Sequence, residues 1–386
     1  MKKAKRLKVL TVVGTRPEII RLSRVMLLLD EQINHIIAHT GQNYDYELNE
    51  IFYKDLDLRK PDYFLNVDVT SLEASVGDII RKSGELLRKE MPDALLVLGD
   101  TNSCLSAYMA KRLHIPIFHM EAGNRCYDFN VPEEINRRVI DHIADFNLVY
   151  TEHARRHLLS EGLSHRRIYL TGSPMNEVLN YYKPKIEASK IAVSLKLVPK
   201  KYFLISTHRE ENVDNPDNLR KIIIILNRLA KDYNVPVIVS THPRTRKRLE
   251  VLSDVKMNSS IQFLKPFGFT DYVHLQMNAI CTISDSGTIS EESAILDFPA
   301  ISLRNSMERP EAQDAGTIIL TGFDPDIVMN SIVIAVNEHD LKQSRQIPAE
   351  YQVPDTSWRV LKLLQGLSGL SNEWHGVVRN LTELIH

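Results

Sequence analysis

The sequence predicts an α/β fold of two Rossmann-like domains whose parallel sheets face each other across a cleft. Short, nearly continuous apolar runs alternate with segments of helical periodicity, which is typical of parallel strands buried on both faces. The runs form two groups, six before residue 175 and five after residue 200. A chain of 386 residues is long enough for two such domains.

The predicted strands follow in chain order. The first group spans residues 8–15, 35–42, 94–100, 115–123, 146–151 and 168–173, and the second spans 202–209, 236–243, 261–267, 280–287 and 300–305. The segment between the groups lacks strand character, so we place the domain junction there. We expect a first domain over residues 1–175, a second over 176–365, and a helical tail over 366–386 that packs back on the first domain.

Composition limits the classes of function. The formal net charge is -1, so bulk electrostatics favour neither nucleic acid nor an anionic membrane as a partner. No apolar stretch approaches the roughly 20 residues of a spanning helix. The short apolar run near the start is followed by Arg16, Pro17 and Glu18, where a signal peptide would have small residues. Three widely spaced cysteines fit a reduced compartment, and we expect a cytoplasmic protein.

Polar residues follow many of the predicted strands, and ligands of open parallel sheets bind at those strand ends. A single acidic residue at such a place usually caps a helix, and a single histidine is usually a structural hydrogen-bonding group. Capping alone does not explain so many ionisable groups. They are Arg16, Glu18, Asp100, His119 and Glu121 in the first half, and His208, Arg209, Glu210, His242 and Arg244 in the second.

Residues 120–145 combine many opposite charges after one buried strand. The acids are Glu121, Asp128, Glu133 and Glu134, and the bases are Arg125, Arg137 and Arg138. Part of this pattern fits a helix that starts at Pro132, because acids favour the first turn and Glu134 and Arg138 are four residues apart. The other reading is a site that uses carboxylates.

A small-residue turn, "SDSGTISEE", precedes a predicted helix in the second half. Free backbone N–H groups at such a turn bind phosphate, so Ser286, Gly287 and Thr288 could hold a diphosphate. Glu291 and Glu292 could then accept hydrogen bonds from ribose hydroxyls. The alternative is an ordinary capped helix with acids in its first turn.

Common cofactor signatures are missing from the sequence. There is no G-x-G-x-x-G and no G-x-x-x-x-G-K-[ST] motif, and the histidines show no metal-ligand spacing. Tyr181 and Lys185 match a short-chain dehydrogenase pair, but Pro184 interrupts the segment and we treat the match as chance. We therefore expect no cofactor and no metal.

The strand-end motifs together resemble the non-hydrolysing UDP-N-acetylglucosamine 2-epimerase family. The resemblance runs from about residue 8 to about residue 335 through "VVGTRPEIIRLSRV", "HTGQNYD", "LGDTNS", "HMEAGNR", "VPEEINRR", "STHREEN", "THPRTR", "ISDSGTISEES" and "MERPEAQDAGT". It implies the glycosyltransferase-B fold, a homodimer and a UDP-sugar substrate.

Two departures from the family pattern indicate a branch. Arg21 stands where the family usually has lysine, and "NRCYDFNVPEEINRR" replaces a Trp-Pro-containing segment. This form resembles the branch that converts UDP-2-acetamido-2,6-dideoxy-L-talose to UDP-N-acetyl-L-fucosamine for capsule or O-antigen synthesis. Plain UDP-GlcNAc/UDP-ManNAc interconversion is the alternative within the family.

The resemblance also implies roles for individual residues. Asp100, Glu121 and Glu133 would be the catalytic carboxylates, with the proton donor and the proton acceptor left unassigned among them. His208 would assist the leaving diphosphate. The UDP-sugar would be bound by Arg16, Arg21, His242, Ser286, Gly287, Thr288, Glu292 and Arg309.

Two other functions share these features. A glycosyltransferase of the same fold would transfer the sugar to an acceptor, and fold alone does not exclude it. A non-catalytic UDP-sugar sensor would not need acids on both faces of the ring.

Overall fold

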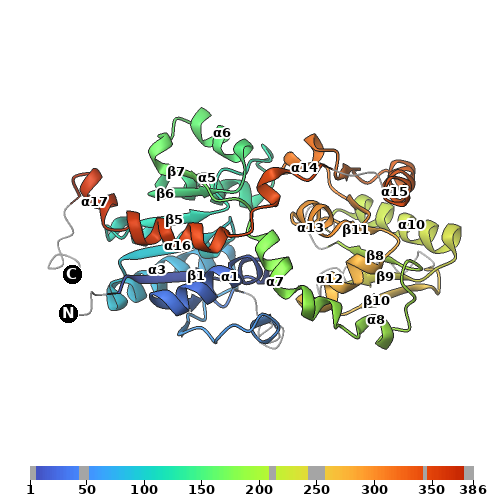
Figure 1. Ribbon diagram of the computed structural model, residues 1–386, viewed down its shortest axis with the longest axis horizontal. Helices are drawn as coiled ribbons and strands as arrows, with labels where there is room; N and C mark the ends of the chain where they lie inside the picture. The colour runs from blue at the N-terminus through green and yellow to red at the C-terminus, as the bar shows by residue number, and fades with distance from the viewer. Residues whose placement is uncertain (1–5, 43–51, 208–213, 242–256, 342–345, 378–386) are drawn as a thin grey trace. The chain divides into compact units, whose positions relative to one another are not determined.

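The computed structural model describes residues 6–42, 52–207, 214–241, 257–341 and 346–377 (Figure 1). The chain divides into two compact units, one formed by Met1–Val178 with Val353–His386 and the other by Leu179–Gln352. Each unit contains one parallel sheet. The predicted α/β class with two parallel sheets is therefore confirmed.

The sheet of the first unit has seven strands in the order β3-β2-β1-β4-β5-β6-β7. Its central strands are apolar and fully buried, as expected for a parallel sheet covered on both faces. The strands are β1 (Lys8–Val13), β2 (Asn34–His39), β3 (Tyr63–Phe64), β4 (Ala94–Leu98), β5 (Ile117–Met120), β6 (Phe146–Val149) and β7 (Ile168–Leu170).

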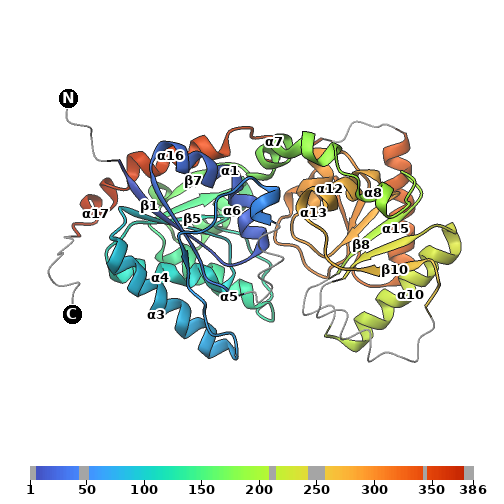
Figure 2. The same ribbon diagram turned by 90° about the horizontal axis from the view of Figure 1, so that it is seen from below.

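Two groups of helices cover this sheet. Figure 2 shows α1 and α16 on one face and α3, α4 and α5 on the other. Within these groups, α1 packs against α16, and α4 packs against α3 and α5. The described helices are α1 (Arg16–Gln32), α3 (Leu72–Glu90), η1 (Asn102–Leu105), α4 (Ser106–Arg112), α5 (Pro132–Ile143), α6 (Glu152–Ser160), η2 (His165–Arg167), α16 (Thr356–Leu367) and α17 (Leu370–Trp374); α7 (Met175–Glu187) spans the boundary between the units.

The chain returns to the first unit before the predicted tail begins. Thr356 Oγ1 donates to the carbonyl oxygens of Thr171 and Ser173 at 3.3 and 3.2 Å, and the N–H of Ser357 donates to Glu177 at 2.8 Å. The whole of α16 therefore lies with the first unit, although we expected residues up to 365 in the second domain. The reason is tertiary, because α16 buries its apolar side against α1.

The second unit contains a six-stranded sheet in the order β10-β9-β8-β11-β12-β13. Its strands are β8 (Phe203–Ser206), β9 (Val237–Ser240), β10 (Ile261–Leu264), β11 (Thr282–Ser284), β12 (Ala300–Ser302) and β13 (Ile319–Leu320). Its described helices are α8 (Ile191–Ser194), α10 (Pro216–Tyr233), α12 (Phe269–Asn278), α13 (Ile289–Leu296), α14 (Glu311–Asp314), α15 (Pro325–Asp340) and η3 (Ala349–Tyr351).

Both sheets reverse their strand order at the first strand of the unit. In each, the chain adds two strands on one side and then crosses to the other, so the order changes between β1 and β4 and between β8 and β11. Ligands of such sheets bind at the carboxyl ends of the strands beside this switch point. Within the units, the segments after β1, β4 and β11 therefore start at the strand ends where sheets of this kind bind ligands.

Candidate active site

Asp100 and Glu121 lie at neighbouring strand ends in the first unit. Leu98 of β4 pairs with Met120 of β5, so the residues that follow both strands emerge side by side. A Cβ atom on Gly99 would lie 3.8 Å from Glu121 Oε2. The sequence prediction of two carboxylates at one sheet edge therefore agrees with the geometry, while their chemical roles stay predictions.

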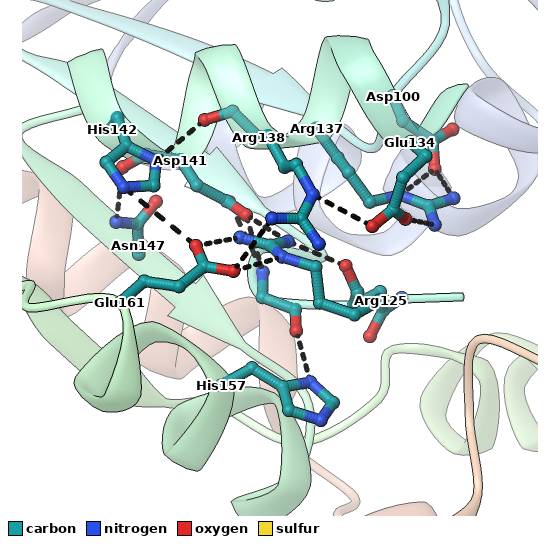
Figure 3. A network of polar contacts seen from close by, with 12 residues as sticks. Asp100, Arg125, Glu134, Arg137, Arg138, Asp141, His142, Asn147, His157 and Glu161 are labelled. Carbon is teal, nitrogen blue, oxygen red and sulfur yellow. Dashed lines mark hydrogen bonds and ion pairs between the residues drawn. The ribbon is translucent and has the colours of Figure 1, made fainter. Parts of the chain in front are cut away.

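Asp100 is held by α5 through two side chains. Arg137 Nε donates to Asp100 Oδ2 at 3.0 Å (Figure 3). Asn136 Nδ2 donates to the main-chain oxygen of Asp100 at 2.9 Å. The Nη1 group of the same guanidinium donates to Glu134 at 2.9 Å. Arg137 thus bridges the half-buried Asp100 and the fully buried Glu134.

Glu134 organises the start of α5. Its carboxylate accepts the N–H of Cys126 at 3.1 Å and the Nε–H of Arg138 at 2.9 Å, the latter being the predicted i,i+4 pair. Burial raises the pKa of Glu134, but the Cys126 N–H and the guanidiniums of Arg137 and Arg138 lower it more, so the group is ionised. Part of the acidic segment is therefore structural, as helix-start acids commonly are.

Glu121 is paired with Arg21, which comes from α1. Arg21 Nη1 contacts Glu121 Oε2, and Asn124 Nδ2 lies 3.5 Å from the other carboxylate oxygen. The φ angle of Glu121 is 63°, a left-handed conformation that is uncommon outside glycine. The structure thus places Arg21 next to a predicted catalytic residue.

Glu133 occupies the first turn of α5 and is half-buried. It precedes Asn136 by three residues, so the two side chains share one face of the helix. Because Asn136 donates to the oxygen of Asp100, this face is the one that meets the end of β4. The third predicted carboxylate therefore projects from the same helix that holds Asp100.

Behind Glu121 lies a buried charge network that the sequence prediction did not include. Asp141 is fully buried, and it contacts Arg125 Nη1 at 2.7 Å and His119 Nδ1 at 3.0 Å. Arg125 also binds Glu161 in a bidentate manner: its Nε donates to Oε1 at 2.8 Å and its Nη2 donates to Oε2 at 2.6 Å (Figure 3). Asp141 follows Glu134 and Arg137 on the buried face of α5. Charged residues at helical spacing on an otherwise buried face are a signal that could have identified it.

Arg16 and Glu18 follow β1 and have different environments. Arg16 lies 5.5 Å above the ring of Phe52. Glu18 is buried and accepts the Gly14 N–H at 3.0 Å, the Thr15 hydroxyl at 2.8 Å and the Ser103 hydroxyl. Burial raises the pKa of Glu18 despite these hydrogen bonds. Glu18 is thus part of the loop scaffold after β1.

The turn after β11 in the second unit is stabilised mainly by its own residues. The N–H of Ser286 donates to Ser284 Oγ at 3.1 Å, and the N–H of Thr288 donates to Ser286 Oγ at 3.3 Å. Ser286 and Thr288 hydroxyls are 3.0 Å apart, and α13 begins directly after them. Ser286, Gly287 and Thr288 therefore form the predicted strand–turn–helix.

The acids in α13 have side-chain partners within the second unit. Glu291 is fully buried and pairs with Arg309, whose Nη1 is also 3.4 Å from the carbonyl oxygen of Gly287. Glu292 accepts from Gln276 Nε2 at 2.7 Å. Of the predicted UDP-binding residues, Arg309, Gly287 and Glu292 thus gather at the start of one helix.

Two predicted site residues cannot be placed. His208 and His242 lie outside the described residues. Among the residues that the structure does describe, no group of three or more His, Cys, Asp or Glu could hold a metal ion. In the same part of the chain, no helix is both long enough and apolar enough to cross a bilayer.

Comparisons with known proteins agree on one family. Residues 27–365 match the family model described as UDP-N-acetylglucosamine 2-epimerase. A UDP-N-acetylglucosamine 2-epimerase from Methanococcus maripaludis is 36% identical over 85% of this chain and 92% of its own length.

Solved structures are similar over nearly the whole chain. A UDP-N-acetylglucosamine 2-epimerase from Rickettsia bellii is 49% identical, with a TM-score of 0.90 over 96% of this chain and 100% of that one. The Methanocaldococcus jannaschii enzyme in complex with UDP-GlcNAc and UDP is 33% identical, with a TM-score of 0.86 over 93% of this chain and 99% of that one.

Proposed function

This chain belongs to the UDP-N-acetylglucosamine 2-epimerase family, whose members are isomerases, and on that premise we propose that it inverts C2 of a UDP-2-acetamido sugar through a 2-acetamidoglycal. The family resemblance noted in the sequence is confirmed. The route through a glycal and the roles of single residues are our proposal.

The chemistry explains why the site needs carboxylates. The hydrogen at C2 is not next to a carbonyl group, so direct deprotonation is prohibitive. Cleavage of the bond between C1 and the UDP oxygen gives the ring positive character, and the C2 proton then passes to a carboxylate. The double bond of the glycal forms between C1 and C2 as UDP departs with the bonding electrons. Protonation of the other face of C2 and return of UDP to C1 complete the inversion.

The observation that carries the proposal is the placement of Asp100 and Glu121. They sit at adjacent strand ends, and each is oriented by a guanidinium, from Arg137 and Arg21 respectively. Inversion needs proton-handling groups for two faces of C2, and anionic groups stabilise an oxocarbenium-like transition state. With Glu133 on the adjoining face of α5, these residues form the proposed catalytic set.

The turn after β11 is the proposed binding site for UDP. Backbone N–H groups at the start of a helix bind phosphate, and Ser286, Gly287 and Thr288 supply such a turn. Arg309 lies beside the carbonyl of Gly287 and adds positive charge, while Glu292 suits a ribose hydroxyl. By resemblance we also assign Arg16 and His242 to UDP binding and His208 to the leaving diphosphate; both histidines lie outside the described residues.

We propose UDP-2-acetamido-2,6-dideoxy-L-talose as the preferred substrate and UDP-N-acetyl-L-fucosamine as its product. The segment "NRCYDFNVPEEINRR" and Arg21 support this choice, since both resemble that branch. UDP-GlcNAc is the second candidate, because the family model and the similar proteins carry that name.

Purified enzyme incubated with each UDP-sugar in turn, without any acceptor, tests the proposal. Proton NMR should show the C2 epimer of one substrate, with free UDP and glycal as minor species. Faster conversion of UDP-GlcNAc would reassign the substrate. No change in either sugar without an acceptor, together with transfer when one is added, would favour a glycosyltransferase.

A further inference from the structure

We propose that Asp141 is the positioning residue for Glu121, and that it holds the strained turn carrying this carboxylate in its reactive conformation. The inference rests on the proposed role of Glu121. Asp141 does not touch the reacting atoms in this account. It acts through the backbone and side chains on both sides of Glu121.

One buried carboxylate contacts three points around the turn. Both oxygens of Asp141 accept the N–H of Gly123 at 3.2 Å, two residues after Glu121. Oδ2 accepts from Arg125 Nη1 at 2.7 Å, and Oδ1 lies 3.0 Å from Nδ1 of His119, two residues before Glu121. Residues 119 to 125 are thus tied to a single side chain of α5.

The turn needs this support because its backbone is unfavourable. Glu121 has a φ angle of 63°, and such a conformation costs a non-glycine residue on the order of 1 kcal/mol or more. Gly123 has a φ angle of 82°, and a Cβ there would lie 2.4 Å from the carbonyl oxygen of Ala154. A strained turn persists only where surrounding contacts determine it, and Asp141 supplies several of them.

His119 extends the network from Glu121 toward Asp100. Its Nε2 lies 2.8 Å from the carbonyl oxygen of Gly99, which can only accept, so Nε2 carries a proton. Nδ1 faces Asp141 in a close charge contact rather than an aligned hydrogen bond. Burial lowers the pKa of His119, but Asp141, the Gly99 carbonyl and Asp100 together raise it more, which favours an imidazolium here.

The same helix fixes the other catalytic candidate. Arg137, one turn before Asp141, holds Asp100, while Asp141 holds the turn of Glu121. Helix α5 therefore sets the separation between the two carboxylates. The group at 141 must be a carboxylate because all three of its partners can donate hydrogen bonds. The side-chain NH₂ group of an asparagine would face one of these three donors, so that two hydrogen-bond donors would point at each other in a buried site.

The test compares Asp141→Asn with Asp145→Asn. Asp145 is also buried and also supports β5, through the Ile117 N–H at 2.9 Å and Lys111 at 2.6 Å, but it does so at the far end of the strand. We expect both variants to lower Tm. Only Asp141→Asn should lower kcat, by about 10²-fold for a displacement near 1 Å, with KM and UDP affinity nearly unchanged. Equal kcat values in the two variants would overturn the inference.

A double-mutant cycle separates positioning from general stabilisation. Because Asp141 acts through Glu121, adding Asp141→Asn to Glu121→Gln should lower kcat little beyond Glu121→Gln alone. Full additivity would contradict the inference. If Glu121→Gln alone leaves kcat unchanged, the proposed function of Glu121 fails instead. Should Asp141→Asn not fold, Arg125→Lys, which loses the fork to Glu161 and loosens the same turn, takes its place in both measurements.

Discussion

The two regions to which we assign catalysis and UDP binding are held together by different contacts. In the first unit, the carboxylates are fixed by side chains far away in the sequence: Arg21 and Glu121 are 100 residues apart, and Arg137 and Asp100 are 37 apart. In the second unit, the turn at Ser286 closes on residues only two positions away. The carboxylates of the first region thus depend on long-range contacts, whereas the turn at Ser286 itself is closed mainly by local hydrogen bonds.

This difference matches the two tasks that we propose. A proton transfer requires a carboxylate in an exact position and orientation, so long-range ion pairs are needed to hold it. A diphosphate is large and charged, and the backbone N–H groups at a helix start bind it without precise side-chain placement. Substitutions in the first region should therefore change kcat, and those in the second should change KM.

Asp100→Asn and Glu121→Gln should produce the largest effect. Each keeps the size of the side chain but removes a proton-handling group, so kcat should fall by between about 10²- and 10⁴-fold. UDP affinity, measured by calorimetry, should stay close to the wild-type value because these residues do not bind UDP in our proposal. Parallel losses of kcat and UDP affinity would show instead that both residues are structural.

Ser286→Ala should have a smaller effect, and the effect should be on KM and not on kcat. Loss of a hydroxyl that orders the turn and, in our proposal, contacts the diphosphate should cost about 1.4 kcal/mol, which corresponds to a roughly tenfold rise in KM, with kcat little changed. Ser293→Ala is the matched control, since Ser293 lies buried in α13, the helix that follows this turn, with an unpartnered hydroxyl. Steady-state kinetics should show no change in this control. A fall in kcat for Ser286→Ala would contradict the assignment of KM effects to the second region.

The smallest effect concerns the pH dependence of stability. The pKa of His119 is raised above its ordinary value of 6.5 in the folded state, so its stabilising contribution is complete below that pH and is lost as the pH rises through the folded pKa. Denaturant unfolding from pH 6 upward should show this decline in the wild type. His119→Asn should flatten it, whereas His114→Asn, at an exposed turn, should not. An unchanged slope in His119→Asn would contradict a charged pair with Asp141.

Much of the fold could be predicted because parallel strands carry their signal locally. The strands predicted over residues 8–15, 94–100 and 280–287 contain β1, β4 and β11 of the structure. The edge strands β3 and β13 were missed, since two residues each give no periodic pattern. The position of α16 was also missed, because its contact with α1 joins the two ends of the chain.

The site could be predicted only in part, for a similar reason. Motif order pointed to Asp100, Glu121 and the turn at Ser286, which all follow strands. Sequence alone did not show which arginine pairs with which acid, and it gave no role to Asp141. Those pairings depend on where α1 and α5 lie relative to the ends of β4 and β5, which is a property of the folded first unit.

The central claim is that carboxylates of the first unit remove and return the proton at C2 of a UDP-2-acetamido sugar. Turnover of UDP-GlcNAc and of UDP-2-acetamido-2,6-dideoxy-L-talose in deuterium oxide, followed by NMR, tests it most directly. We predict that the product carries deuterium at C2 and that the Glu121→Gln enzyme epimerises the sugar and exchanges this position at least about 10²-fold more slowly. Full conversion to the epimer with the original hydrogen kept at C2 would contradict the account.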